Sequence, residues 1–212
     1  MTNRFINYSE KIADAVSDAK FWNVHDHYKD RSLEDLANIQ ARASLPFAVC
    51  ILNLTGDLNV GMIIRTACTM GASEVVLFGR RKYDKRSTVG AQHYIPIHRH
   101  DGFCGDSEAL DIDLFRRVMV DYGYEPIFVE QGGTPIEMID WESFLGNGHI
   151  IDPPKVCLVF GNESEGIPPE MMVGEKVVSI TQHGVLRSLN VSAAAAIVIH
   201  SLSTYLGKGK II

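Results

Sequence analysis

The sequence predicts an α/β fold in which a mainly parallel sheet is covered by helices on both faces. Short runs at 47–52, 74–78 and 155–160, apolar throughout or after a charged first residue, are typical of strands buried on both sides. Amphipathic segments separate them, and one of these, 111–122, ends at Gly123 as helices commonly end at glycine. Strands that alternate with helices favour parallel pairing.

The predicted elements follow in order from Phe47. We expect strands at 47–52, 74–78, 94–98, 125–130, 155–160 and 176–180, and helices at 59–70, 111–122, 141–145, 169–173 and 188–206. Gly132 and Gly133 are predicted to form a turn. The domain prediction is an N-terminal extension over 1–46, with a short helix behind Ser32, and a main domain over 47–212.

Composition limits the class of protein. The chain has 212 residues, of which 46% are hydrophobic, enough for one core. It contains no apolar run long enough for a membrane span and no secretion signal at its start, so we expect a cytoplasmic protein. Its four cysteines lack metal-site spacing. The sequence His25-Asp26-His27 is a weak metal-binding pattern, and exposed polar residues are the favoured interpretation; no metal is expected.

The charge is unevenly distributed. The net charge of −6 argues against a nucleic-acid partner, because phosphate binding depends on Lys and Arg. However, the segment Gly79–Arg86 carries five cations in eight residues. A solvated loop and an RNA-docking loop are both compatible with this run. The docking hypothesis assigns phosphate contacts to Arg80, Arg81, Lys82, Lys85 and Arg86, with Tyr83 stacking on an unpaired base.

Three polar segments stand out against the apolar runs. The first is Asn59-Val60-Gly61-Met62-Ile63-Ile64-Arg65, the second Gly161-Asn162-Glu163-Ser164-Glu165-Gly166, and the third Ser188-Leu189-Asn190-Val191-Ser192 at the start of an Ala-rich helix. In this order they resemble the motifs of the SPOUT superfamily, in its SpoU/TrmH-type RNA 2′-O-ribose methyltransferase branch. The resemblance extends from about Phe47 to about Leu206.

The resemblance implies more than the pattern of strands does. It implies a C-terminal trefoil knot, which nothing in periodicity indicates because knots are almost absent among folds. It also implies S-adenosylmethionine as methyl donor, a ribose 2′-hydroxyl of tRNA or rRNA as acceptor, and a homodimer. The apolar helix that follows Asn190 is compatible with such an interface and equally with an ordinary core helix.

Four residues match the family's donor-binding positions: Gly161, Ile180, Ser188 and Leu189. The family contacts its donor largely through backbone groups there, so a turn glycine and ordinary core residues are the competing interpretations. Thr181 departs from the family, which usually has proline after the strand. The resemblance therefore says less about the geometry of this loop than about the motifs around it.

Five residues match the family's catalytic positions: Asn59, Arg65, Glu163, Ser188 and Asn190. We expect Arg65 to stabilise the substrate phosphate or the developing alkoxide, since guanidinium stays protonated. It lies on an otherwise apolar helix, where a cation requires a function or a partner such as Glu163. For the other four, structural capping is the alternative, and Ser188 or Asn190 can cap the last helix.

Two other functions compete with ribose methylation. One is a catalytically weak RNA-binding or ribosome-associated protein that keeps the fold, which the presence of Asn59, Arg65, Glu163, Ser188 and Asn190 disfavours. The other is methylation of a base, which the ribose-type motifs disfavour. Nothing in the sequence indicates which RNA or which nucleotide is the substrate.

Overall fold

Six parallel strands form the centre of the part of the protein that the structure describes. The computed structural model describes residues 23–53, 56–80, 82–104, 109–146 and 154–208. Its sheet has the order β3-β2-β1-β5-β4-β6, and every described pairing is parallel. The strands are β1 (Phe47–Leu52), β2 (Glu74–Phe78), β3 (Ile97–His100), β4 (Glu125–Pro135), β5 (Val156–Phe160) and β6 (Lys176–Ser179). The predicted parallel sheet is confirmed.

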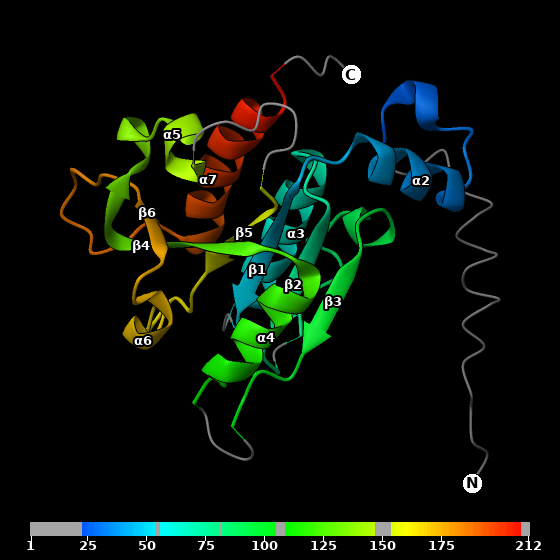
Figure 1. The fold of residues 1–212 in the computed structure, drawn as a ribbon. Coiled ribbons are helices and arrows are strands. Elements are labelled where there is room, and N and C mark those ends of the chain that lie inside the picture. Colours follow the sequence, from blue (N-terminus) through cyan, green and yellow to red (C-terminus); the bar gives the residue numbers. More distant parts are fainter. Residues whose placement is uncertain (1–22, 54–55, 81, 105–108, 147–153, 209–212) are drawn as a thin grey trace, which may run out of the picture.

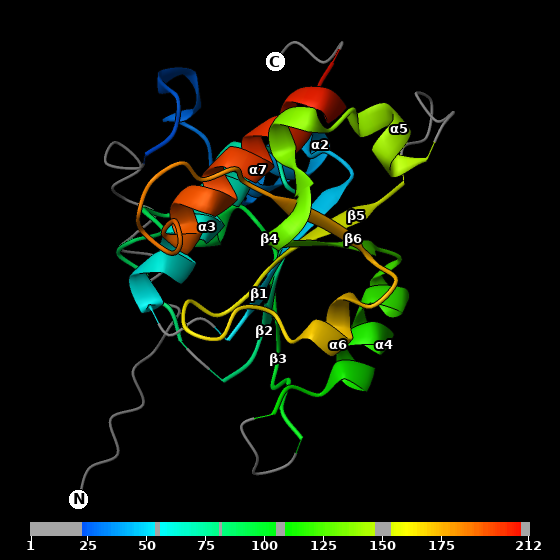
Figure 2. The same cartoon turned by 90° about the vertical axis from the view of Figure 1, so that its left-hand side faces the viewer.

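Helices cover both faces of this sheet, as Figures 1 and 2 show. One face packs against α3 (Asp57–Thr69), α5 (Trp141–Leu145) and α7 (Val191–Leu206). The other packs against α4 (Ile112–Tyr122) and α6 (Pro169–Met172). Because β1 and β5 are covered on both sides, all their residues are buried, which explains why they read as unbroken apolar runs.

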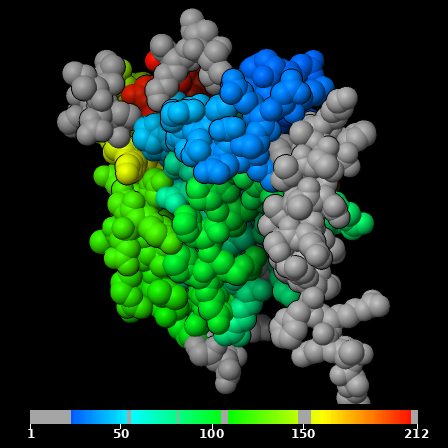
Figure 3. All heavy atoms as spheres, turned by 90° about the vertical axis from the view of Figure 1, so that its right-hand side faces the viewer, coloured from blue at the N-terminus to red at the C-terminus, as the bar shows by residue number. Residues whose placement is uncertain are grey.

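The N-terminal part of the described chain packs at the end of α3. It contains the 3₁₀ turn η2 (Asp26–Tyr28) and the helix α2 (Leu33–Ala43), which lies at the top of the face in Figure 3. Ser32 caps α2 by accepting from the Asp35 amide at 3.1 Å, as predicted. Gln40 Nε2 donates to the carbonyl of Cys68 at 3.0 Å, which attaches α2 to α3.

Several predicted boundaries are wrong. The segment predicted as a strand at 94–98 follows the 3₁₀ turn η3 (Ala91–His93), and β3 starts only at Ile97. The predicted turn at Gly132 and Gly133 is part of β4, which continues past a register shift to pair again with β6 and leads into η4 (Ile136–Met138). Gly132 takes a φ of 85°, so glycine here serves the irregularity rather than a turn.

Two helices begin at other residues than predicted. The first, α3, begins at Asp57, so Asn59 lies in its first turn rather than before it. The second, α7, begins at Val191, and the residues 188–190 precede it. Within the described residues, no helix is long and apolar enough to span a membrane.

The strand order predicts a ligand site at the edge of the sheet where the strands have their carboxyl ends. Strands β1 and β5 are neighbours at the centre, and the connections run outward from them in opposite directions. Parallel α/β sheets bind ligands beyond the carboxyl ends of the strands where the order reverses. The segments that follow β1, β2, β4, β5 and β6 all emerge at this edge.

Candidate functional site

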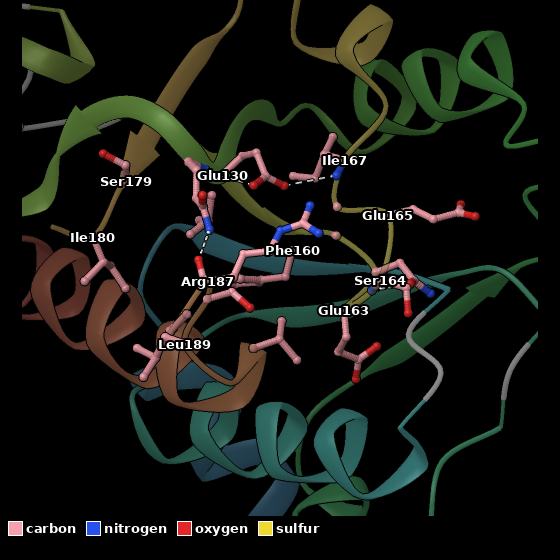
Figure 4. A pocket seen from close by; sticks show the side chains of 18 of the residues that line it. Glu130, Phe160, Glu163, Ser164, Glu165, Ile167, Ser179, Ile180, Arg187 and Leu189 are labelled. Carbon is pink, nitrogen blue, oxygen red and sulfur yellow. Dashed lines mark hydrogen bonds between the residues drawn. The ribbon is translucent and has the colours of Figure 1, made fainter. Parts of the chain in front are cut away.

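A cavity of about 640 Å³ opens at this edge, within the range of small-molecule sites. We call it the edge pocket. Its walls come from the end of β4, the segment 160–169 after β5, the segment 179–190 around and after the end of β6, and the first turn of α7 (Figure 4). Both apolar side chains and polar groups line this pocket, so it suits a ligand that has an apolar part and a polar part.

The segment 161–167 is held tightly against two strands. Asn162 and Gly166 exchange backbone hydrogen bonds of 3.2 and 2.8 Å. Asn162 Nδ2 donates to the carbonyl of Asn53, just past β1, at 2.9 Å. A Cβ on Gly161 would lie 2.6 Å from the backbone of Gly166, so only glycine fits there without a shift. Backbone groups of this loop therefore line the pocket in a fixed arrangement.

A chain of side-chain hydrogen bonds connects the three polar segments. Asn59 Nδ2 donates to Glu163 Oε1 at 2.9 Å, and Asn190 Nδ2 donates to Asn59 Oδ1 at 3.2 Å. Glu163 Oε1 also accepts from the Gly56 amide at 3.4 Å. Asn59 is thus in direct contact with two residues that follow it in the sequence by 104 and 131 positions, and these contacts lie at the mouth of the edge pocket.

Asn190, and not Ser188, caps α7. Its Oδ1 accepts from the amides of Ser192 and Ala193 at 2.9 and 3.4 Å. The prediction that Ser188 can cap this helix is wrong, because the helix begins three residues later. Ser188 is exposed and lines the edge pocket, which leaves its hydroxyl accessible to a ligand.

The predicted donor residues all line this pocket. Gly161, Ile180 and Ser188 are among its lining residues, and so is Leu189, which is 42% exposed. Thr181, at the family's usual proline position, uses its side chain: its hydrogen bond is the main cause of the lowered pKa of the Glu137 carboxyl in η4. Thr181 therefore attaches the loop to η4, just after β4, by a side-chain contact that proline cannot make.

Arg65 is placed differently from the prediction. It lies on the outer face of α3 with Leu58 and Met62, at helical spacing, and is exposed. Among the described residues it has no hydrogen-bond or ion-pair partner, and the alternative pair with Glu163 is not formed. The expectation of an unfavourable apolar environment is wrong, because the buried stripe of α3 lies on its other side. Arg65 does not line the edge pocket.

Among the pocket residues that were not identified from the sequence are Glu130, Gln131 and Arg187. Glu130 Oε2 accepts from the Ile167 amide at 3.1 Å, and Gln131 Nε2 donates to the Arg187 carbonyl at 2.9 Å. These contacts connect β4 to both pocket loops. The sequence does contain a signal for Glu130 and Gln131, because they are the first two adjacent polar residues after the buried part of a predicted parallel strand. Ligands bind at this end of parallel strands.

The segment Gly79–Arg86, which carries five cations, lies at the same edge of the sheet, but two of these cations form ion pairs within the protein. Arg80 pairs with Asp101 at 2.6 Å, and Arg86 pairs with Asp84 at 2.7 Å. Lys82 and Lys85 are exposed, while Arg81 lies outside the described residues.

Tyr83 does not extend into solvent. It packs partly against the core, and this burial is the main cause of its raised pKa. Tyr83 is nevertheless only partly buried, so its stacking on an unpaired base stays a prediction.

We find no candidate metal site among the described residues. They contain no group of three or more His, Cys, Asp or Glu side chains placed to hold an ion. At the weak pattern predicted from the sequence, Asp26 pairs with Lys29 at 2.5 Å, and the rings of His25 and His27 stack on one another.

Comparisons with known proteins agree on one family. The sequence model of the SpoU rRNA Methylase family matches residues 46–200. A protein of Archaeoglobus fulgidus, described as an uncharacterized tRNA/rRNA methyltransferase, is 28% identical over 163 residues, which are 74% of this chain and 64% of the relative. A second, from Mycobacterium avium, is 26% identical over 80% of this chain and 51% of the relative. The chain thus spans about half to two thirds of these relatives.

Solved structures share the fold. The AdoMet-bound rRNA methyltransferase from Sinorhizobium meliloti is 26% identical, with a TM-score of 0.60 over 81% of this chain and 60% of that chain. The TrmH/SpoU tRNA modifying enzyme of A. aeolicus is 19% identical, with a TM-score of 0.63 over 84% of this chain and 83% of that chain.

Proposed function

Because the chain belongs to the SpoU rRNA methylase family, we propose that it transfers a methyl group from S-adenosylmethionine to a ribose 2′-hydroxyl of tRNA or rRNA. The convergence of three distant polar segments on one pocket carries this proposal. A fold kept only for RNA binding would not require Asn59, Glu163 and Asn190 to be linked at the mouth of a small-molecule cavity. Related proteins that are described as AdoMet-bound support the choice of donor.

The edge pocket is the donor site in this proposal. Ile180 and Leu189 supply apolar walls for the adenine ring, and the close-packed loop at Gly161 supplies backbone groups. Ser188 lies at the mouth, where the methyl group would face the acceptor. The protein contributes by holding donor and acceptor in line, which can supply a large part of a transfer reaction's acceleration.

The hydrogen-bonded chain of Asn59, Glu163 and Asn190 is the acceptor side. Glu163 fixes Asn59, and Asn59 fixes Asn190, so the amides at the pocket mouth are positioned before the ribose arrives. Arg65 supplies the charge that stabilises the developing alkoxide, and it does so without removing the proton itself, because guanidinium has no free acceptor.

The proposal includes a homodimer and a C-terminal knot. The outer faces of α3 and α7 expose Leu58 at 55%, Met62 at 50% and Ile197 at 41%, and the two helices pack side by side. An apolar surface of this kind is typical of a subunit interface. A dimer through this face would bring Arg65, which is exposed in the single subunit, close to the partner subunit. The knot is the family's arrangement of the segments that follow β5, and residues 1–46 are proposed as an extension of the catalytic domain.

Labelled methyl transfer tests the function. The protein is incubated with radiolabelled S-adenosylmethionine and total RNA, and the positions that become resistant to alkali are mapped. The proposal predicts label in RNA at alkali-resistant positions, and at least a hundredfold less label with Asn190→Ala. Label at alkali-sensitive positions would indicate base methylation. Donor binding without transfer to any RNA would favour the catalytically weak RNA-binding alternative.

A further inference from the structure

Arg187 extends into the edge pocket as an unpaired cation. Figure 4 shows its guanidinium above Phe160, directed toward the carboxylate of Glu130. No ion pair within 4.0 Å joins Arg187 to Glu130 or to any other described residue, and no hydrogen bond to its guanidinium is formed within the described chain. Among the described residues that line the pocket, Arg187 is the single Lys or Arg.

The main chain holds Arg187 in this position. Its carbonyl accepts from Gln131 Nε2 at 2.9 Å, which attaches the exposed segment 181–190 to the end of β4. The side chain therefore starts from a fixed point on the pocket rim, and its direction into the cavity is not imposed by a protein partner. A guanidinium in this situation is suited to a planar anion, which it can bind with two parallel hydrogen bonds.

We propose that Arg187 recognises the carboxylate of the donor's methionyl end, and that Glu130 faces the α-ammonium group of the same end. This inference rests on the proposed function, since it takes S-adenosylmethionine as the ligand. The methionyl end carries one positive and one negative group on a single carbon. Opposite charges that face each other across a cavity without pairing are complementary to such a zwitterion.

Glu130 is held more firmly than Arg187. Its Oε1 accepts from the Gln131 amide at 2.9 Å and its Oε2 from the Ile167 amide at 3.1 Å. Gly166 leaves room for it, because a Cβ there would lie 2.6 Å from Glu130 Oε2. The carboxylate is thus a fixed acceptor on the pocket wall, whereas the side chain of Arg187 is exposed and is not held by a hydrogen bond or ion pair within the described residues. Glu163 and Glu165 also line the pocket but are exposed, and Glu163 is bound to Asn59.

Two donors that differ only in the carboxylate test the assignment. Calorimetric titration of the whole chain with S-adenosylmethionine and with decarboxylated S-adenosylmethionine gives the affinity ratio that the carboxylate produces. We expect the wild type to bind the complete donor at least tenfold more tightly, because a hydrogen bond to a charged group is worth roughly ten- to a hundredfold in affinity. In Arg187→Ala this ratio should fall to about one, through loss of affinity for the complete donor alone. Arg187→Lys should retain part of the preference.

Gln182→Ala is the matched control, because Gln182 is an exposed pocket residue in the same loop without the charge. It should leave the ratio unchanged. The assignment is overturned if Arg187→Ala keeps the wild-type ratio, or if it weakens both ligands equally. A wild type that binds neither ligand would overturn the proposed function together with this inference, whereas tight donor binding with an unchanged ratio would overturn the inference alone.

Discussion

Replacement of Arg65 by alanine separates chemistry from binding more cleanly than any other single change. Arg65 has no partner among the described residues, lies on the exposed face of α3, and does not line the edge pocket. An exposed side chain of this kind contributes within about 0.5 kcal/mol to the free energy of unfolding. For a chain of this size the melting temperature should therefore change by only about 1–2 °C.

The expected kinetic effect is much larger. Loss of one group that stabilises charge in the transition state costs about a hundred- to a thousandfold in turnover, on the order of 3–4 kcal/mol. Single-turnover methyl transfer to RNA measures this loss, and calorimetry measures donor affinity in parallel. We expect Arg65→Ala to lose turnover and to bind S-adenosylmethionine within about twofold of the wild type. Arg65→Lys, which keeps the charge, should recover part of the rate.

A parallel fall in donor affinity and turnover would refute this account of Arg65. It would mean that the residue supports the fold or the pocket, in contradiction to its exposed position. Unchanged turnover would refute the account equally, because Arg65 would then contribute nothing to the reaction.

Three further predictions follow from the structure. Light scattering should give about twice the 23.5 kDa monomer mass, and Ile197→Glu should reduce it to one monomer, whereas Val120→Glu, on α4 of the opposite face, should not; a monomeric wild type would exclude the proposed interface. Lys82→Ala with Lys85→Ala should reduce the slope of log affinity for RNA against log salt by about 1.5–2, while the exposed Lys155→Ala control, at the opposite edge of the sheet, should not; an unchanged slope would place RNA elsewhere. Burial raises the pKa of the Cys68 thiol from 9.0 to about 11, so folding favours the neutral thiol, and this contribution is complete below pH 9 and lost as the pH rises to 11. The melting temperature should fall less steeply over that range in Cys68→Ala than in the wild type, and equal slopes would show that folding does not raise the pKa of this thiol.

The strands of the central sheet were predictable because they are buried on both faces. A run such as Phe47–Leu52 has no polar residue, and no helical interpretation fits its length. The end of β4 was not predictable in the same way, because its continuation past Gly132 depends on pairing with β6, which lies more than 40 residues later. Local glycine propensity indicates a turn, and the distant strand overrides it.

The same distinction applies to the site. Asn59, Glu163 and Asn190 were identified as a group, and the structure brings them into contact. The position of Arg65 was misjudged because its neighbours in sequence are apolar, although helical spacing places it on the same face as the exposed Met62. Arg187 was missed because a single arginine in an exposed loop carries no pattern, and only the fold shows that it points into a cavity.

The site of methylation is the most direct test of the proposed function. RNA modified by the purified protein is digested to nucleosides, and fragmentation in the mass spectrometer separates the mass of the base from that of the ribose. The account predicts a gain of one methyl group on the ribose fragment and none on the base, and its loss when Asn59→Ala breaks the contacts to Glu163 and Asn190. A methyl group on the base fragment, or full ribose methylation by Asn59→Ala, would contradict it.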